Sequence, residues 1–123
     1  KRRYKAAAKE YAKALAALSG PQPLVSAKLA GALLRQGHNR KVPGIVTPAL
    51  ELNPNQVLLY LYRGKARLAL GRYEAAHRDL VAAVRINPFD PEVHGLLAEA
   101  LDKLGRSAEG EEERRLHRLV NSR

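Results

Sequence analysis

The sequence contains no cysteine, no methionine and no tryptophan. The absence of cysteine excludes disulfide bonds, thiolate catalysis and cysteine-ligated metals, but it leaves cytoplasm and bacterial periplasm both open. The absence of methionine, even at position 1, indicates an excised piece of a longer protein, so a targeting signal would be outside it. No apolar run approaches the roughly 18–20 residues that cross a bilayer, so we expect no transmembrane segment in this piece.

Acidic and aromatic side chains are also few. The 123 residues include 22 Lys/Arg and 12 Asp/Glu, for a net charge of +10. Residues 1–90 alone hold 16 Lys/Arg and 5 Asp/Glu. This balance suits either a basic surface for an anionic polymer (a polysaccharide of an envelope or secretion system, or a nucleic acid) or an ordinary solvated surface. The scarcity of aromatic side chains disfavours nucleic acid, because single-strand binders stack bases on them. The arginines that would meet phosphates form one stripe: Arg63, Arg67, Arg72, Arg78 and Arg85.

Motifs for catalysis are missing as well. No serine lies in a Gly-x-Ser-x-Gly motif, and no histidine has the i, i+4 partner of a helical zinc site. His94 and His117 fall on inward helical positions, where we expect packed polar side chains. The acidic run Glu111–Glu113 precedes arginines at i+3 and i+4, which is typical of a solvated helix face. We therefore predict no catalytic residue, no cofactor and no metal.

Several residue types recur with a period of 34. Gly37, Gly71 and Gly105 are separated by 34 residues each time, and so are Asn53, Asn87 and Asn121. A fixed period in this range predicts a stacked array of small structural units. Such an array offers an extended surface for binding.

Each period predicts two helices. In residues 57–88, apolar residues recur at helical spacing on both sides of Gly71, which ends the first helix because glycine accepts positive φ. Asn87-Pro88 ends the second, because a residue before proline leaves the α region. The small residues Gly64, Ala76 and Ala83 allow the two helices to approach closely.

The same unit fits twice more, and a half-unit precedes it. Residues 1–18 match only the second helix of a unit, with one extra residue placed within 19–23. The sequence thus predicts an all-α chain of about seven helices, organised as a truncated repeat over 1–20, repeats over 23–56 and 57–90, and a divergent capping repeat over 91–123. Pro43 fits a first helical turn, whereas Pro48 predicts a break near Thr47-Pro48.

Residues 70–76 (Leu-Gly-Arg-Tyr-Glu-Ala-Ala), followed by Leu80, Ala83 and Asn87-Pro88, resemble the tetratricopeptide repeat pattern. The resemblance covers essentially the whole chain and is strongest over 57–90. Arg67 departs from it, since a large apolar residue is usual there, and so do Arg114 and His117. The resemblance implies a fragment of a longer tetratricopeptide repeat protein, folded as a right-handed superhelix of helix pairs with a concave groove.

The resemblance also implies which residues line that groove, mainly from the first helix of each pair. They run from apolar with a few basic positions to acidic, which favours a peptide with apolar side chains and a basic end. The carboxylate-clamp subtype is not predicted, because its positions hold Ala27, Gly31, Leu61 and Glu92. The implied groove residues are Leu24, Ala27, Gly31, Leu34, Arg35, Leu58, Leu61, Lys65, Leu68, Glu92, Glu99 and Asp102.

Three hypotheses about function follow. The first is a non-enzymatic scaffold that binds a peptide or partner segment in the groove, as part of a larger multi-repeat assembly protein. The second is a basic module that contacts an anionic polymer. The third is a structural spacer in a long solenoid. The first helix lacks a mate on one side, which also predicts self-association through its apolar face.

Overall fold

The computed structural model describes residues 2–17 and 22–121, and α-helices make up most of them. The extra residue expected within 19–23 and the side chain of His117 both fall outside the described part. The elements are α1 (Arg2–Ala17), α2 (Pro23–Arg35), the 3-10 helix η1 (Asn39–Lys41), α3 (Val42–Leu52), α4 (Val57–Ala69), α5 (Tyr73–Ile86), α6 (Pro91–Lys103) and α7 (Ser107–Asn121).

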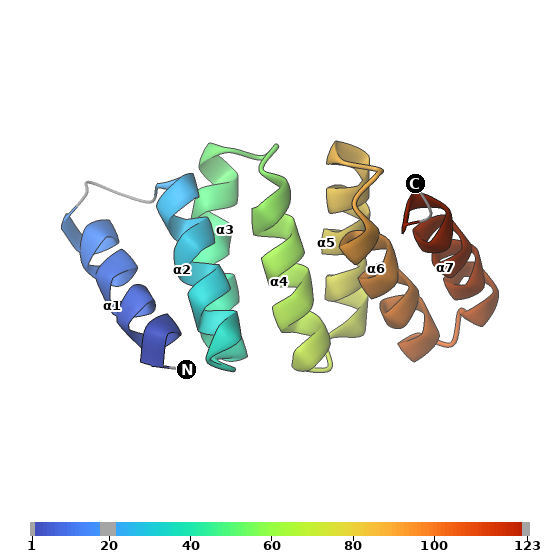
Figure 1. Ribbon diagram of the computed structural model, residues 1–123, viewed down its shortest axis with the longest axis horizontal. Helices are drawn as coiled ribbons and strands as arrows, with labels where there is room; N and C mark the ends of the chain where they lie inside the picture. Colours follow the sequence, from blue (N-terminus) through green and yellow to red (C-terminus); the bar gives the residue numbers. More distant parts are fainter. Residues whose placement is uncertain (1, 18–21, 122–123) are drawn as a thin grey trace.

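The helices stack in chain order along one axis (Figure 1). Helices α2, α4 and α6 form an inner layer, nearer the viewer in Figure 1, while α3 and α5 lie behind them and, with α7, form an outer layer. Each helix packs against its neighbours in sequence, and α2 also contacts α4 across the inner layer. Helices α1 and α7 lie at opposite ends. The predicted all-α solenoid is therefore confirmed.

The three glycines of the 34-residue period form the turns between the inner and outer layers. Gly37, Gly71 and Gly105 have φ values of 82°, 78° and 76°, a left-handed conformation that costs glycine little. In each turn the next N–H bonds back to a carbonyl near the helix end; for Gly71 this is Arg72 N–H to the Arg67 carbonyl, at 2.8 Å. All three turns lie along the lower edge in Figure 1.

The periodic asparagines act at the opposite edge. The side-chain oxygens of Asn53 and Asn87 accept hydrogen bonds from backbone N–H groups two residues on, at 3.3 and 3.2 Å. Such Asx turns lead the chain out of a helix. Asp90 is the N-cap of α6, and its carboxylate accepts from the N–H of Glu92 at 2.9 Å. These local bonds lead the chain from α3 into α4 and from α5 into α6.

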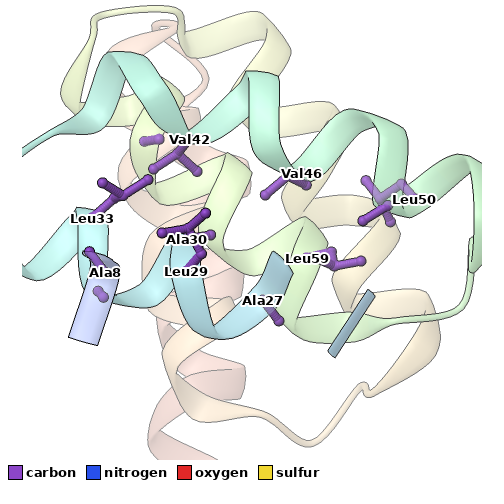
Figure 2. Packing of buried hydrophobic residues seen from close by; sticks show 12 residues of the cluster. Ala8, Ala27, Leu29, Ala30, Leu33, Val42, Val46, Leu50 and Leu59 are labelled. Atoms are coloured by element: carbon purple, nitrogen blue, oxygen red, sulfur yellow. The ribbon is translucent and has the colours of Figure 1, made fainter. Parts of the chain in front are cut away.

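Two hydrophobic clusters hold the helices together. The first joins α1 to α4 and includes Leu29, Val42, Val46 and Leu59, as Figure 2 shows. The second joins α4 to α6 and includes Leu80 and other buried side chains of the three helices. Helix α4 contributes to both clusters.

Close contact between α4 and α5 depends on a missing side chain. A Cβ atom added to Gly64 would lie 3.0 Å from the Leu80 side chain, which is tighter than ordinary packing. Ala76 and Ala83 on α5 are fully buried. The close approach expected from these three small residues is confirmed.

Pro48 does not break α3, contrary to the expectation from the sequence. The helix runs without interruption over Val42–Leu52. Pro48 cannot donate a hydrogen bond to the Gly44 carbonyl, but both residues are exposed, so water can satisfy that carbonyl. The inward side chains of Val46 and Ala49 are fully buried. Their burial outweighs the local cost of proline.

Among the described residues, no helix is both long enough and apolar enough to cross a membrane.

Candidate functional site

An open cavity of about 670 Å³ lies between α1 and the inner layer. Its walls come mainly from α1, α2 and α4, with single residues from η1 and α6. Helix α1 contributes Arg3, Tyr4, Ala7 and Tyr11; α2 contributes Lys28, Gly31, Ala32, Leu34 and Arg35; α4 contributes Leu58, Leu61, Tyr62, Lys65 and Ala69. Asn39 and Glu92 complete the lining. None of the described lining residues comes from the outer layer.

Helical periodicity brings these side chains to one side of each helix. On α2, the cavity residues Lys28, Gly31 and Arg35 are spaced by three and four, so they share a face. On α4, Leu58, Leu61 and further residues recur with the same spacing. Because the helices stack with these faces on the same side, the cavity extends over neighbouring helices.

The structure brings seven of the twelve expected groove residues together around the cavity. These are Gly31, Leu34, Arg35, Leu58, Leu61, Lys65 and Glu92.

The other five lie elsewhere. Leu24 is exposed on α2, outside the cavity lining. Ala27 and Leu68 are buried in the two hydrophobic clusters, so their side chains contact the core and not the solvent. Glu99 is exposed on α6, and Asp102 forms an ion pair with Arg114.

Sequence reasoning missed the contribution of α1. Arg3, Tyr4, Ala7 and Tyr11 line the cavity, although the first helix was expected to belong to the non-groove half of a repeat. The spacing of three and four residues between Tyr4, Ala7 and Tyr11 was a usable signal, because it marks one helix face. Lys28 and Tyr62 were missed as well; Lys28 lies four residues after Leu24, on the same face of α2.

The cavity is basic at its rim. Lys65 Nζ lies 2.7 Å from Glu92 Oε2, so that positive charge is compensated. Arg35 donates from Nη1 to the Tyr4 hydroxyl at 3.2 Å, and its guanidinium lies 5.4 Å from the centre of the Tyr4 ring. Within the part of the chain that the structure describes, Arg3, Lys28 and Arg35 form no ion pair.

The cavity floor is apolar. Leu61 is 3 % exposed, whereas Leu58 is 39 % exposed and reachable from solvent. The Tyr62 ring passes over Gly31, where an added Cβ would lie 3.4 Å from the ring. Glycine at this position lets the Tyr62 ring lie close to α2. An apolar floor with a few polar groups around it is the usual make-up of a binding site.

Two arginines of the expected stripe bind a carboxylate within the molecule. Arg63 binds the carboxylate of Asp79 with two nitrogens, at distances of 2.7 to 3.1 Å, and Arg67 Nη1 binds it at 2.9 Å. Asp79 is only 3 % exposed. Arg67 thus departs from the repeat pattern because it compensates a buried acid. Two of the five arginines are held by this contact, which weakens the hypothesis of an anionic polymer.

The cavity offers apolar contacts and charged groups to a ligand. The described residues contain no cluster of three His, Cys, Asp or Glu side chains that could hold a metal ion. His94 is buried and bonded, as expected of a packed polar residue: Nδ1 lies 2.7 Å from Glu113 Oε2 and Nε2 lies 2.6 Å from the Pro88 carbonyl oxygen.

Solved structures with this arrangement of helices are tetratricopeptide-type proteins. A crystal structure of MamA superposes with a TM-score of 0.88 at 18 % identity, over 95 % of this chain and 68 % of that one. A second MamA structure, from AMB-1, covers 82 % of this chain and 60 % of its own, with a TM-score of 0.76 at 19 % identity. The chain thus spans about two thirds of the length of MamA.

A third structure contains a bound peptide. It is the second tetratricopeptide domain of Spaghetti (RPAP3) bound to the HSP90 peptide SRMEEVD, with a TM-score of 0.77 at 18 % identity, over 80 % of this chain and 92 % of that one. At such identities the likeness establishes the fold alone.

No curated protein matches the sequence significantly. A family model does match: that of the bacterial transcriptional activator domain, over residues 1–120. The match spans nearly the whole chain, including α1 and the basic rim of the cavity. This chain, with its tetratricopeptide-type fold, belongs to the bacterial transcriptional activator domain family.

Proposed function

We propose that this chain is a non-enzymatic protein-interaction module, which binds a segment of a partner protein in the cavity between α1, α2 and α4. The observation that carries the proposal is the cavity itself. Its volume of about 670 Å³ falls in the usual range for ligand sites. It is built on helices that are fixed by two buried clusters, so the surface is formed before a ligand arrives.

The exposed leucine in the cavity favours a protein segment as the ligand. Leu58 is 39 % exposed beside the apolar floor, and burying such a side chain contributes about 1 kcal/mol or more. A partner that places an apolar side chain against Leu58 removes both surfaces from water. The likeness in fold to a repeat domain that is bound to a peptide supports a peptide or partner segment as the ligand.

The test needs a variant that changes the cavity without unfolding the chain. Leu61 is unsuitable, because it is 3 % exposed and belongs to the second cluster. Leu58→Asp places a charge at an accessible position of the floor. Leu52→Asp is a matched control, because Leu52 is 62 % exposed at the end of α3, outside the cavity lining.

The experiment selects binders from a displayed library of random 15-residue peptides. We expect enriched peptides whose affinity, measured by fluorescence anisotropy, falls at least about tenfold in Leu58→Asp, since an unpaired charge replaces apolar contact. Leu52→Asp should bind them like the wild type. Circular dichroism confirms that both variants fold. The proposal is wrong if no peptide is enriched, or if enriched peptides bind both variants equally.

A further inference from the structure

The cavity has an excess of positive charge that the molecule itself does not neutralise. Among the described lining residues, four are cations, and only Lys65 has a carboxylate partner, Glu92, which is also the single acidic side chain among them. Arg3, Lys28 and Arg35 are all exposed on α1 and α2. A ligand that fills this space therefore meets three unneutralised cations around an apolar floor.

Arg35 is positioned so that its charge stays available. It donates one hydrogen bond to the neutral Tyr4 hydroxyl and lies over the Tyr4 ring. A guanidinium has five N–H donors in a fixed fork, so donors remain for a carboxylate. The contact with Tyr4 holds the fork at the rim without cancelling its charge. Less side-chain freedom is then lost when an acidic group binds.

The apolar floor favours a peptide over a nucleic acid as the ligand of the cavity. Tyr11 and Tyr62 pack against the first cluster and are only partly exposed, so their ring faces are used in the fold. A single-stranded nucleic acid needs such faces for stacking. An acidic peptide needs only an apolar side chain for the floor and carboxylates for the rim.

A second copy of this chain is a poor occupant. Its acidic stretch lies on α7, but Glu111 and Glu112 already bind Arg114 and Arg115, at 2.6 Å in each pair. Glu109 binds Arg106 at 2.8 Å. Docking α7 into the cavity of another copy would exchange these ion pairs within one chain for similar ion pairs between two chains. The exchange would therefore add little stability to a dimer.

We infer that the segment bound in the cavity is an acidic peptide: an apolar side chain contacts Leu58, and flanking Asp or Glu carboxylates bind Arg3, Lys28 and Arg35. This inference rests on the function proposed above and names the chemistry of its partner. Positive charge around a cavity also raises the rate of encounter with an acidic partner, in a salt-dependent way.

The test uses the peptides whose binding depends on Leu58. We expect them to be enriched in Asp and Glu relative to the starting library. Replacing their Asp and Glu by Asn and Gln should weaken binding about tenfold at 50 mM salt and less at 500 mM, because salt screens exposed charges. Lys28→Gln should weaken the acidic peptides about threefold to fivefold and leave their neutral versions unchanged.

A matched variant controls for net charge. Lys9→Gln removes one exposed cation of α1 that does not line the cavity, and it should leave both peptides unaffected. The inference is overturned, with the interaction module intact, if Leu58-dependent peptides lack acidic enrichment or bind Lys28→Gln normally. It is also overturned if a 12-base-pair DNA duplex displaces them from the wild type more readily than the unlabelled peptide does. A dimer that Lys28→Gln dissociates in analytical ultracentrifugation would assign the cavity to a second copy instead.

Discussion

At the scale of single residues, His94 links three segments of the chain. It lies on α6, its Nδ1 faces Glu113 on α7, and its Nε2 faces the Pro88 carbonyl in the α5–α6 connection. A neutral imidazole can donate from only one nitrogen, so both acceptors are satisfied only by the protonated ring. Burial is the largest influence and lowers the pKa of His94, but the Pro88 carbonyl, Glu113 and Asp90 together raise it above 6.5.

This geometry predicts a stability that depends on pH. Because the pKa of His94 is raised in the folded state, its contribution is complete below the unfolded value of 6.5 and is lost as the pH rises through the folded pKa. The free energy of unfolding, measured with urea between pH 5.5 and 8.5, should therefore fall across this window. In His94→Gln the fall should be largely absent, since glutamine does not titrate.

An NMR titration of the His94 ring is an independent check of the same prediction. A midpoint below 6.5 would contradict it. So would an unchanged pH dependence in the glutamine variant.

Residue roles were only partly predictable from the sequence. The turn glycines and the asparagines could be assigned, because their function is local and repeats every 34 residues. The role of Asp79 could not, because its partners Arg63 and Arg67 belong to another helix and meet it only after folding. Asp79 lies between the inward positions Ala76 and Ala83, so a buried acid there was a detectable signal.

At the scale of helices, the Asp79 carboxylate connects α5 to α4, and Arg63 continues the connection to α3 through the Thr47 hydroxyl at 3.0 Å. The side chains of Arg63 and Arg67 are 15 % and 22 % exposed, which leaves them little water to replace a lost partner. A buried charge without its partner is strongly destabilising.

Removing the charge of Asp79 should therefore destabilise the middle of the molecule. We expect Asp79→Asn to lower the free energy of unfolding by about 3 kcal/mol, as for other broken buried ion pairs. Chemical denaturation measures the change. Glu10→Gln is the control: it breaks the exposed Lys13–Glu10 pair and should change nothing measurable. An Asp79→Asn variant as stable as the wild type would show that the cluster does not hold these helices together.

The helices themselves were predictable in number and order, because amphipathic periodicity and turn residues act locally. Two features of single helices could not be predicted from the sequence. The intrinsic cost of Pro48 was clear from the sequence, but the burial of Val46 and Ala49 that offsets it depends on packing. The sequence marks one face of α1 by its spacing, but whether that face lines a cavity depends on how α1 lies against α2, which no repeat pattern specifies.

At the scale of the whole molecule, α4 occupies the central place. It contributes Leu59 to the first cluster and Leu61 to the second, whereas, within the described residues, α1 packs only on α2 and α7 only on α6. In stacked repeats each unit is stabilised by its neighbours, so a terminal helix is supported from one side only.

Hydrogen exchange should show this gradient. We expect amides of α4 to exchange slowest, and those of α1 and α7 at least about tenfold faster, because terminal helices open without the rest. Exchange followed by mass spectrometry of peptic fragments resolves the helices. Uniform protection from α1 to α7 would mean that the chain opens only as a whole.

The position of the three glycine turns on one edge has an electrostatic consequence. Because every glycine turn lies on one edge, α2, α4 and α6 all point the same way, and their N-termini line the opposite edge. Peptide dipoles give helix starts a partial positive charge and helix ends a partial negative one. Along the inner layer, the N–H groups of helix starts thus lie on one border of the binding surface and the carbonyl groups of helix ends on the other, while the antiparallel helices α1, α3, α5 and α7 place their opposite ends beside them.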